Sequence, residues 1–423
     1  MLKRNSVDII SKLKNLEPQF RFKPERRISV PRKDLIKWIP GEEVTNDFGS
    51  YFKSITQYSE DEIYGTGYMQ ALKIPDGKGF ALAGKDENLL DFSYKKALFI
   101  DTETTGLAGG TGTLPFLIGI GSFSDNQFII EQYMMRDYDE ETAVLKALEP
   151  RFKQAEYIVS YNGKSYDLNI ICTRLILNRI VNYLNDLHHF DLLYTVRRIW
   201  GPRLQDCSLI NVEREILNFY RDDDIPGYMI PHIYFKYIKS GNGKNLDQVF
   251  RHNRLDILTL AVLAGRTANI YLDPEKCLEY PRDFASIARS YESLGELDKA
   301  ALCYKKAIQN EHFQSDREQI LYRLGFLYKR RLLWRQANDI WDYIISNYTD
   351  SLTAYEELAK YYEHKKRDFR KASEIVNKAL KRIEIREELK GGFQYVPTRA
   401  AFEYRLKRLK RKGLQEQENF SDI

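Results

Sequence analysis

The sequence has few cysteines and no long apolar run, and both shortages exclude classes of protein. The four cysteines, Cys172, Cys207, Cys277 and Cys303, lie far apart and form no C-x-x-C pair, so neither a disulfide framework nor a structural zinc site is indicated. No apolar run approaches the roughly 20 residues needed to cross a bilayer. The N-terminus also lacks the uninterrupted apolar core of a signal peptide. We therefore expect a cytoplasmic protein with reduced thiols and no membrane contact.

The small net charge of +5 hides an uneven distribution. Residues 1–40 carry 11 Lys and Arg against 4 Asp and Glu, residues 41–280 carry 25 against 34, and residues 281–423 carry 29 against 22. An acidic centre between basic ends suits a protein that binds a polyanion at its edges and cations in its middle. On charge alone, solvated faces are the simpler interpretation.

A chain of 423 residues exceeds what one hydrophobic core usually serves, so two or three domains are expected. We interpret residues 1–90, which prolines interrupt repeatedly, as a basic, partly ordered N-terminal extension with one or two strands near residues 64–74. Residues 91–272 have the pattern of an α/β domain, a mixed sheet flanked by helices. The expected strands are 97–100, 116–123, 128–134 and 157–161, and the expected helices are 140–152, 165–178 and 251–263.

Residues 281–385 read as helix after helix with an internal repeat. Tyr291, Tyr328 and Tyr362 are 37 and 34 residues apart, and each follows an apolar and a small residue at the same offset. This alternation of large and small residues resembles tetratricopeptide repeats, in which paired helices stack on the next pair. A generic helical bundle remains the alternative. Residues 386–423 form a basic C-terminal tail, in which Leu406 and Leu409 are spaced for one helical face. It could cap the repeats and contact phosphate as well, and a solvated capping helix is the simpler interpretation.

Two carboxylates stand at the end of the strand expected at 97–100. Alternate side chains of a strand share a face, so Asp101 and Glu103 should converge. Converging carboxylates repel each other, and a bound Mg²⁺ or Mn²⁺ would remove the repulsion because it takes oxygen ligands. An isolated D-x-E is common, however, and on its own is better read as two solvated acids.

Two further segments add to this pair. Asp167 lies in the first turn of the helix expected at 165–178, and His252 and Asp256 are four residues apart on one helical face. Together with Asp101 and Glu103, these side chains could hold two metal ions that clamp the attacking and leaving oxygens of a phosphodiester. His252 could take the proton from the attacking water.

The three motifs, Asp101-x-Glu103, Asn162-x-x-x-Tyr166-Asp167 and His252-x-x-x-Asp256, resemble in order and separation those of the DEDD exonucleases, which have a ribonuclease H-like fold. The resemblance implies that four acids (Asp101, Glu103, Asp167 and Asp256) bind two Mg²⁺ or Mn²⁺ ions, and that His252 is the general base of a 3′–5′ exonuclease. We call this set the four acids below. One departure concerns His252, since the histidine subclass usually has its base five residues before the last Asp. One residue rotates a helical side chain by about 100°, so the base could approach differently.

Longer stretches, including FIDTETTGLAGGTGTLPFLIGIG, YNGKSYDLNII and FRHNRLDILTLAVL, resemble the bacterial YprB (MrfB)-like ribonuclease H-like proteins over about residues 95–270. That resemblance extends to the helical repeats. It implies DNA as a substrate favoured over RNA, a role in DNA repair, and a superfamily-two helicase as a possible protein partner.

Several other residues are weaker candidates. We expect substrate contacts from Thr104, Asn162 and Lys164, although a turn-forming Asn with an exposed Lys is nearly as good an interpretation. Segment 106–113 is read as a flexible link rather than a phosphate-binding loop, and Asp191 as a structural cap. Segment 221–227 is read as a loop with capping acids. Three histidines lack partners at ligand spacing and are not expected to bind metal: His188, His189 and His232.

The sequence therefore supports one main functional hypothesis and two alternatives. The main hypothesis is a DNA 3′–5′ exonuclease that uses two metal ions. An exoribonuclease with the same mechanism is the alternative within enzymes. The alternative from another class is a repeat scaffold with a vestigial nuclease site, which the presence of all four acids disfavours.

Overall fold

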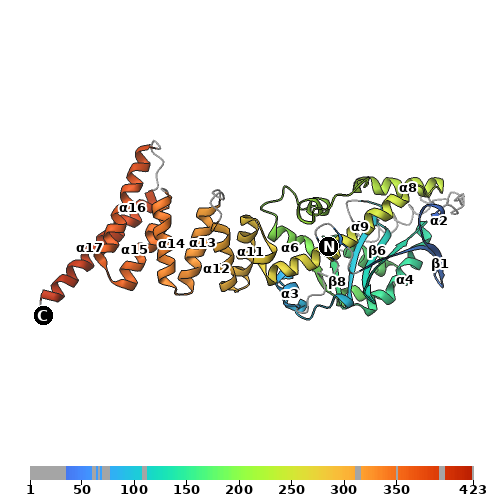
Figure 1. Cartoon of the computed structure of the whole chain (residues 1–423), viewed down its shortest axis with the longest axis horizontal. Helices are drawn as coiled ribbons and strands as arrows, with labels where there is room; N and C mark the ends of the chain where they lie inside the picture. Colours follow the sequence, from blue (N-terminus) through green and yellow to red (C-terminus); the bar gives the residue numbers. More distant parts are fainter. Residues whose placement is uncertain are drawn as a thin grey trace, which may run out of the picture.

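The computed structural model describes residues 35–59, 63–64, 67–68, 77–106, 112–309, 316–348, 351–389 and 396–421. A sheet with helices on its faces forms one end of the molecule, and successive helices run from it toward the C-terminus (Figure 1). The expected class, a ribonuclease H-like α/β domain followed by an all-α region, is confirmed.

The main sheet has seven strands in the order β1-β2-β7-β6-β5-β8-β9. Their bounds are Glu42–Asn46 for β1, Gly49–Ser59 for β2, Ala97–Thr104 for β5, Pro115–Ser124 for β6, Gln127–Met134 for β7, Tyr157–Ser160 for β8 and His188–Asp191 for β9. Strands β5, β6 and β7 form the expected antiparallel meander, and β5, β8 and β9 are parallel. Asp125 and Asn126, both with positive φ, make the tight turn between β6 and β7.

The N-terminal boundary that we expected at residue 91 is wrong. Strand β2 pairs with β7 over eight residues, and β1 pairs with β2, so both belong to the same sheet as β5. Buried Arg136, just after β7, donates to Glu43 of β1 and so adds a charged contact to the pairing. A short hairpin β3–β4 (Ile63–Tyr64 and Gly67–Tyr68) forms a separate two-stranded sheet. The prolines that suggested an extension lie outside β1 and β2.

Helices cover both faces of the main sheet, and each face has its own apolar core. Helices α4 (Glu141–Gln154), α5 (Asp167–Leu177) and α8 (Ile230–Ser240) share one core with residues such as Leu98 and Ile118. On the other face pack α3 (Lys78–Gly84), α6 (Leu192–Ile199) and most of α9 (Leu246–Leu272), whose first turns join the first core through Leu246, Val249 and Phe250. Helix α9 is long and apolar enough to cross a membrane, but 72% of its most apolar window is buried in the fold. Burial against the sheet accounts for that composition.

Helix α9 approaches the sheet closely because β6 carries glycine where the two meet. A Cβ at Gly119 would lie 2.2 Å from Asn253 Oδ1 and 2.4 Å from Ile257 Cδ1. Gly119 also pairs with Asp101 on the neighbouring strand. Any larger side chain at this position would push α9 away from β5.

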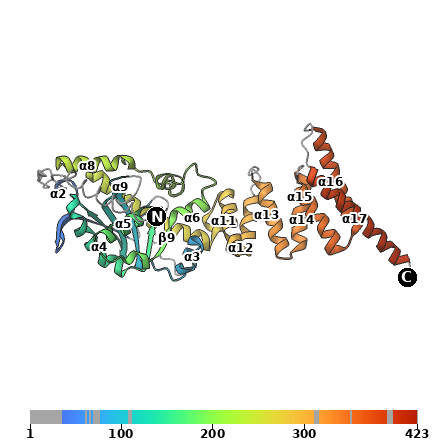
Figure 2. The ribbon, with the colours of Figure 1, turned by 180° about the vertical axis from the view of Figure 1, so that it is seen from behind.

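The C-terminal region consists of helices that contact one another in sequence: α10 (Pro274–Cys277), α11 (Pro281–Ser293), α12 (Leu297–Gln309), α13 (Arg317–Arg330), α14 (Trp334–Asn347), α15 (Leu352–Tyr361), the π-helix η8 (Tyr362–Lys366), α16 (Phe369–Leu389) and α17 (Val396–Ser421). Most of the large and small residues of the repeat pattern are buried at these contacts, among them Tyr291, Tyr304 and Tyr328. A Cβ at Gly325 would lie 2.5 Å from the Trp341 ring, so the small residue is needed there. Figure 2 shows this region from behind, with α17 at the end far from the sheet.

The basic tail packs back on the repeats as helix α17. Leu409 is buried and Leu406 partly buried, as their spacing predicts. Three basic residues of α17, namely Arg405, Arg408 and Lys412, donate to the buried carboxylate of Glu363. Burial raises the pKa of Glu363, but the bonds from Arg408 and Lys412 outweigh it and lower that pKa to about 2. Part of the tail's positive charge is therefore used inside the protein.

Replacement of Glu363 by glutamine should loosen α17. We expect Glu363→Gln to lower the free energy of unfolding by about 2 kcal/mol in urea titrations, because three cations lose a charged acceptor. The lowered pKa means that this stabilisation is fully present above about pH 4.5 and is lost as the pH falls toward 2. Glu403 lies on the exposed face of α17. Glu403→Gln is therefore the control and should change the free energy of unfolding by less than about 0.5 kcal/mol. Equal losses in both variants would contradict this assignment.

Addition of one methyl group at Gly119 should separate α9 from the sheet. We expect Gly119→Ala to cost about 1–3 kcal/mol of stability, because Asn253 and Ile257 must move to admit the new carbon. Gly227→Ala is the matched control, since a Cβ there meets nothing within 4 Å. Thermal unfolding of the two variants checks the prediction, and a Gly119→Ala protein as stable as the control would refute it.

Candidate active site

The two acids of β5 share one face of the strand. Asp101 and Glu103 are partly exposed, whereas Thr102 and Thr104 between and after them are buried, which is the alternation that the sequence predicts. Burial raises the pKa of Asp101 well above its usual range, and the charges of Asp256 and Asp167 add to this. Burial, and next the charge of Asp101, raise the pKa of Glu103 well above its usual range. The two carboxylates therefore lie within each other's electrostatic field.

Asp167 is the first residue of α5, as expected, and the turn before it is fixed by Asp191. The carboxylate of Asp191 accepts from the backbone N–H of Asn162 at 2.8 Å and of Lys164 at 3.0 Å. It also caps α6 by accepting from Leu193, so its interpretation as a structural cap is confirmed. Thr102 donates from β5 to Asp167. Burial raises the pKa of Asp167 to about 6 despite this bond.

Helix α9 brings the last two predicted residues to the acids of β5. His252 and Asp256 lie one turn apart, with His252 Nε2 3.7 Å from Asp256 Oδ2. Between them, Asn253 donates to the Asp101 carboxylate at 2.8 Å and to its backbone carbonyl at 3.2 Å. Gln132 of β7 in turn donates to Asn253. This amide pair, which the motifs did not single out, joins the helix to the strand at the site.

A loop between the π-helix η6 (Glu213–Leu217) and the 3₁₀ turn η7 (Gly227–Met229) also reaches the site. Arg221 forms ion pairs with Asp256, with Asp224 at 2.9 Å and with Glu213 at 2.6 Å. Both oxygens of Asp224 lie 2.9 Å from His252 Nδ1. The sequence suggested only capping acids here. Asp224 does accept from the backbone N–H of Ile225, but the loop also supplies Arg221 and Asp224 to the candidate active site.

Burial and hydrogen bonding have opposite effects on the pKa of His252. Burial lowers the pKa of His252, but its hydrogen bond to Asp224 and the charge of Asp256 outweigh burial and raise that pKa. The pKa of Asp224 is lowered, since its bonds to His252 and Arg221 outweigh burial. The contact is therefore a charge-assisted pair in a largely enclosed position.

The expected substrate-contacting residues behave differently from one another. The side chains of Asn162 and Lys164 are exposed on the turn before α5 and remain candidates. Thr104 is buried, and its hydroxyl donates to the Gly106 carbonyl and lies 3.0 Å from the Tyr166 hydroxyl, so its side chain is engaged within the protein. Of segment 106–113, residues 107–111 lie outside the described residues.

Three histidines were not expected to bind metal: His188, His189 and His232. His189 Nε2 lies 2.7 Å from the Ser160 hydroxyl, and burial lowers its pKa to about 3. His188 is exposed on β9, and His232 lies on α8.

The donor chemistry of the site fits hard divalent cations, although the side chains are not preassembled around one. Four carboxylates contribute oxygen ligands, and the raised pKa values of Asp101 and Glu103 reflect a concentration of negative charge that a cation would relieve. Within the described ranges, no three His, Cys, Asp or Glu side chains are grouped as ligands of one ion. Arg221 and Asn253, bonded to Asp256 and Asp101, occupy part of the carboxylates' coordination capacity.

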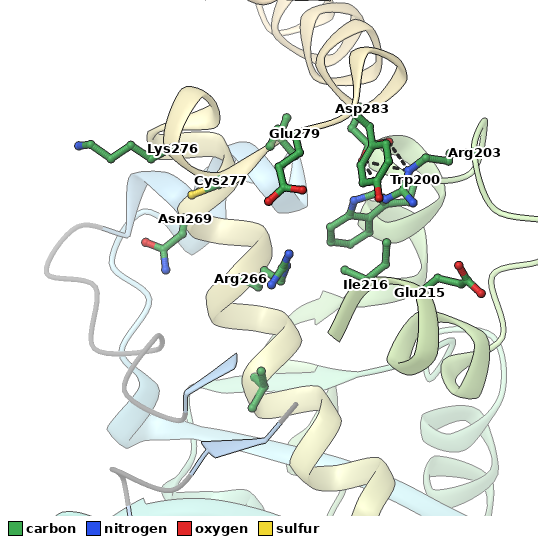
Figure 3. Close-up of a pocket in the computed structure, with 13 residues that line it drawn as sticks. Trp200, Arg203, Glu215, Ile216, Arg266, Asn269, Lys276, Cys277, Glu279 and Asp283 are labelled. Atoms are coloured by element: carbon green, nitrogen blue, oxygen red, sulfur yellow. Dashed lines mark hydrogen bonds and ion pairs between the residues drawn. The ribbon is translucent and has the colours of Figure 1, made fainter. Parts of the chain in front are cut away.

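A cavity of about 530 Å³ lies elsewhere, where α9 meets α10 and α11. Its lining includes Trp200, Arg266 and Asp283, with Arg203 held by Asp283 (Figure 3). None of the four acids lines it, since the α9 residues involved begin at Val262. This cavity is a feature of the junction between sheet and helices.

Comparison with known proteins places these elements in a family. Residues 98–268 match the RNase_H superfamily, a span that runs from β5 to α9 and contains the four acids, His252 and the Arg221 loop. YprB of Bacillus subtilis (strain 168) is 30% identical to this chain over 293 residues, which are 68% of this chain and 70% of YprB. The chain belongs to the RNase H superfamily and, within it, to the family of YprB.

Proposed function

We propose that this protein is a cytoplasmic, metal-dependent 3′–5′ exonuclease that hydrolyses phosphodiester bonds of DNA. Membership of the RNase H superfamily and of the YprB family supports a nuclease. The observation that carries the proposal is the convergence of the four acids and His252 from strand β5 and helices α5 and α9, close enough for their charges to shift one another's pKa values. A structural role would not require so many mutually repelling groups.

The four acids are the residues that we assign to two Mg²⁺ or Mn²⁺ ions. RNase H-like nucleases generally use divalent metals, and the all-oxygen donor set suits these two ions. When bound, a pair of such ions stabilises the charge that develops on the attacking and leaving oxygens of a phosphodiester. The bond from Thr102 orients Asp167, and that from Asn253 orients Asp101.

We assign the proton transfer to His252. Its Nε2 is on the side of Asp256, where it can take a proton from a water molecule that attacks the phosphorus atom. The exposed side chains of Asn162 and Lys164, beside Asp167 in sequence, are our candidates for contacts with the phosphate backbone. This arrangement would place the scissile bond between the turn before α5 and the helix α9.

The helical region is our candidate for recruitment of a partner. Its stacked helix pairs are consistent with tetratricopeptide-like repeats, which commonly offer extended binding surfaces. The resemblance to YprB-like proteins makes a superfamily-two helicase, in a DNA-repair pathway, the partner to test first.

Loss of one acid should abolish cleavage without unfolding the protein. We expect Asp101→Asn and Asp167→Asn each to lower kcat by about 10³-fold or more, because removal of a ligand disrupts the metal pair. The assay follows the length of an oligodeoxynucleotide that carries a label at its 5′ end. Separate reactions contain Mg²⁺, Mn²⁺ or a chelator. With a metal ion present, we expect a ladder of products shortened from the 3′ end. Asp186→Asn, on the exposed turn after α5, is the matched control and should cleave normally. Cleavage that resists chelator, or an active Asp101→Asn protein, would exclude the mechanism.

The choice of nucleic acid is a separate prediction. With matched DNA and RNA oligonucleotides of one sequence, single- and double-stranded, we expect DNA to be degraded faster. Faster loss of RNA would identify an exoribonuclease with the same machinery. If purified protein degrades none of the four substrates with either metal ion, the enzyme proposal fails and a repeat scaffold is favoured instead.

A further inference from the structure

The four-residue spacing of His252 and Asp256 does not by itself determine which ring nitrogen of His252 faces the four acids. At this spacing both side chains rise from the same face of α9, one turn apart. An imidazole can rotate about its side-chain bonds, and a general base works only when one ring nitrogen faces the reacting water. Something must therefore hold the ring with its free nitrogen toward the four acids.

Asp224 makes the contact that can do this. Both of its carboxylate oxygens lie 2.9 Å from His252 Nδ1, while Nε2 is on the other side of the ring, 3.7 Å from Asp256 Oδ2. A carboxylate accepts hydrogen bonds only, so we assign a proton to Nδ1, which leaves the lone pair of the neutral ring on Nε2. Both side chains are largely enclosed, with 9% of His252 and 10% of Asp224 exposed.

Asp224 is itself held by a rigid frame. Arg221 Nη1 donates to its Oδ2 at 2.9 Å, and the backbone N–H of Ile225 donates to its Oδ1 at 3.0 Å. Arg221 Nη1 also lies 3.4 Å from His252 Nδ1. The guanidinium makes two 2.6 Å bonds to Glu213, whose side chain is 1% exposed. Thr259 donates to Glu213 as well. Because Thr259 lies on α9, the chain of contacts that holds Asp224 is anchored on the same helix that carries His252.

We propose that Asp224 is the positioning residue for His252 and compensates for the four-residue spacing. It fixes the tautomer and the ring plane, so that Nε2 faces the carboxylates. This inference rests on the proposed nuclease function. Asp224 does not touch the reacting atoms, and its effect on catalysis must pass entirely through the imidazole.

A double-mutant cycle tests that dependence. Asp224→Asn keeps the size of the side chain but replaces one acceptor oxygen by a donor amide, and we expect kcat to fall about 10- to 100-fold with KM little changed. In a His252→Ala background the same substitution should have no further effect on kcat, because the group that Asp224 positions is gone. Asp222→Asn, an exposed acid two residues earlier in the same loop, is the matched control and should behave as wild type.

Two readouts separate positioning from a general loss of structure. Binding of Mn²⁺ alone, measured by calorimetry, should be unchanged in Asp224→Asn. Imidazole ¹⁵N spectra of the wild type at alkaline pH, where the rings are neutral, should show His252 protonated on Nδ1. The spectrum does not require the variant to fold, so a ring protonated on Nε2 overturns the inference by itself.

The outcomes also distinguish this inference from the function on which it depends. If wild type is active and His252→Ala is impaired, but Asp224→Asn is fully active or loses as much activity in the His252→Ala background, the inference is wrong and the nuclease proposal stands. If wild type cleaves no nucleic acid, the proposed function is wrong and the inference falls with it. If His252→Ala is as active as wild type, His252 is not the base and Asp224 has nothing to position.

Discussion

The close packing of α9 across the sheet is the constraint on which the site depends. At Gly119 the helix comes so near to β6 that a single added carbon would overlap Asn253. That proximity lets Asn253 bond directly to Asp101, and it sets the distance between the acids of β5 and the side chains of His252 and Asp256. Asp101 of the strand and Asn253 of the helix, 152 residues apart in sequence, are thereby held together.

The four acids repel one another where they converge. The fold offsets this repulsion with hydrogen-bond donors and an arginine that contact the carboxylates. Burial and mutual charge raise the pKa of Asp101 and Glu103. Asn253 donates to Asp101, Thr102 donates to Asp167, and Arg221 pairs with Asp256. The three donors come from different elements of the fold. Together they surround the carboxylates and offset the repulsion between them.

Much of the α/β domain could be predicted from the sequence, because its signals are local. Short apolar runs predicted β5, β6, β7 and β8, and alternation along β5 predicted that Asp101 and Glu103 share a face. The place of β2 in this sheet was missed because its partner, β7, lies some 75 residues further along the chain, and β1 joins the sheet only through its hairpin with β2.

The predicted and the missed residues of the site differ in the same way. The four acids stand in motifs with fixed spacing, whereas Arg221 and Asp224 lie in an irregular loop whose path across α9 depends on the tertiary fold. Thr104, which follows the D-x-E motif, is turned inward by strand alternation, to Gly106 and Tyr166. Alternation along β5 thus places Glu103 on the same face as Asp101 and Thr104 on the buried face.

Helix α9 also connects the site to the helical region, which limits how the two can act together. The N-terminal half of α9 carries His252 and Asp256, while residues near its C-terminal end, such as Tyr271, pack on Tyr291 of α11. The apolar core of this face of the sheet continues without a break into the repeats as far as Leu409 of α17. A core shared in this way resists independent movement of its two ends. The helical region is therefore held at a fixed orientation to the four acids.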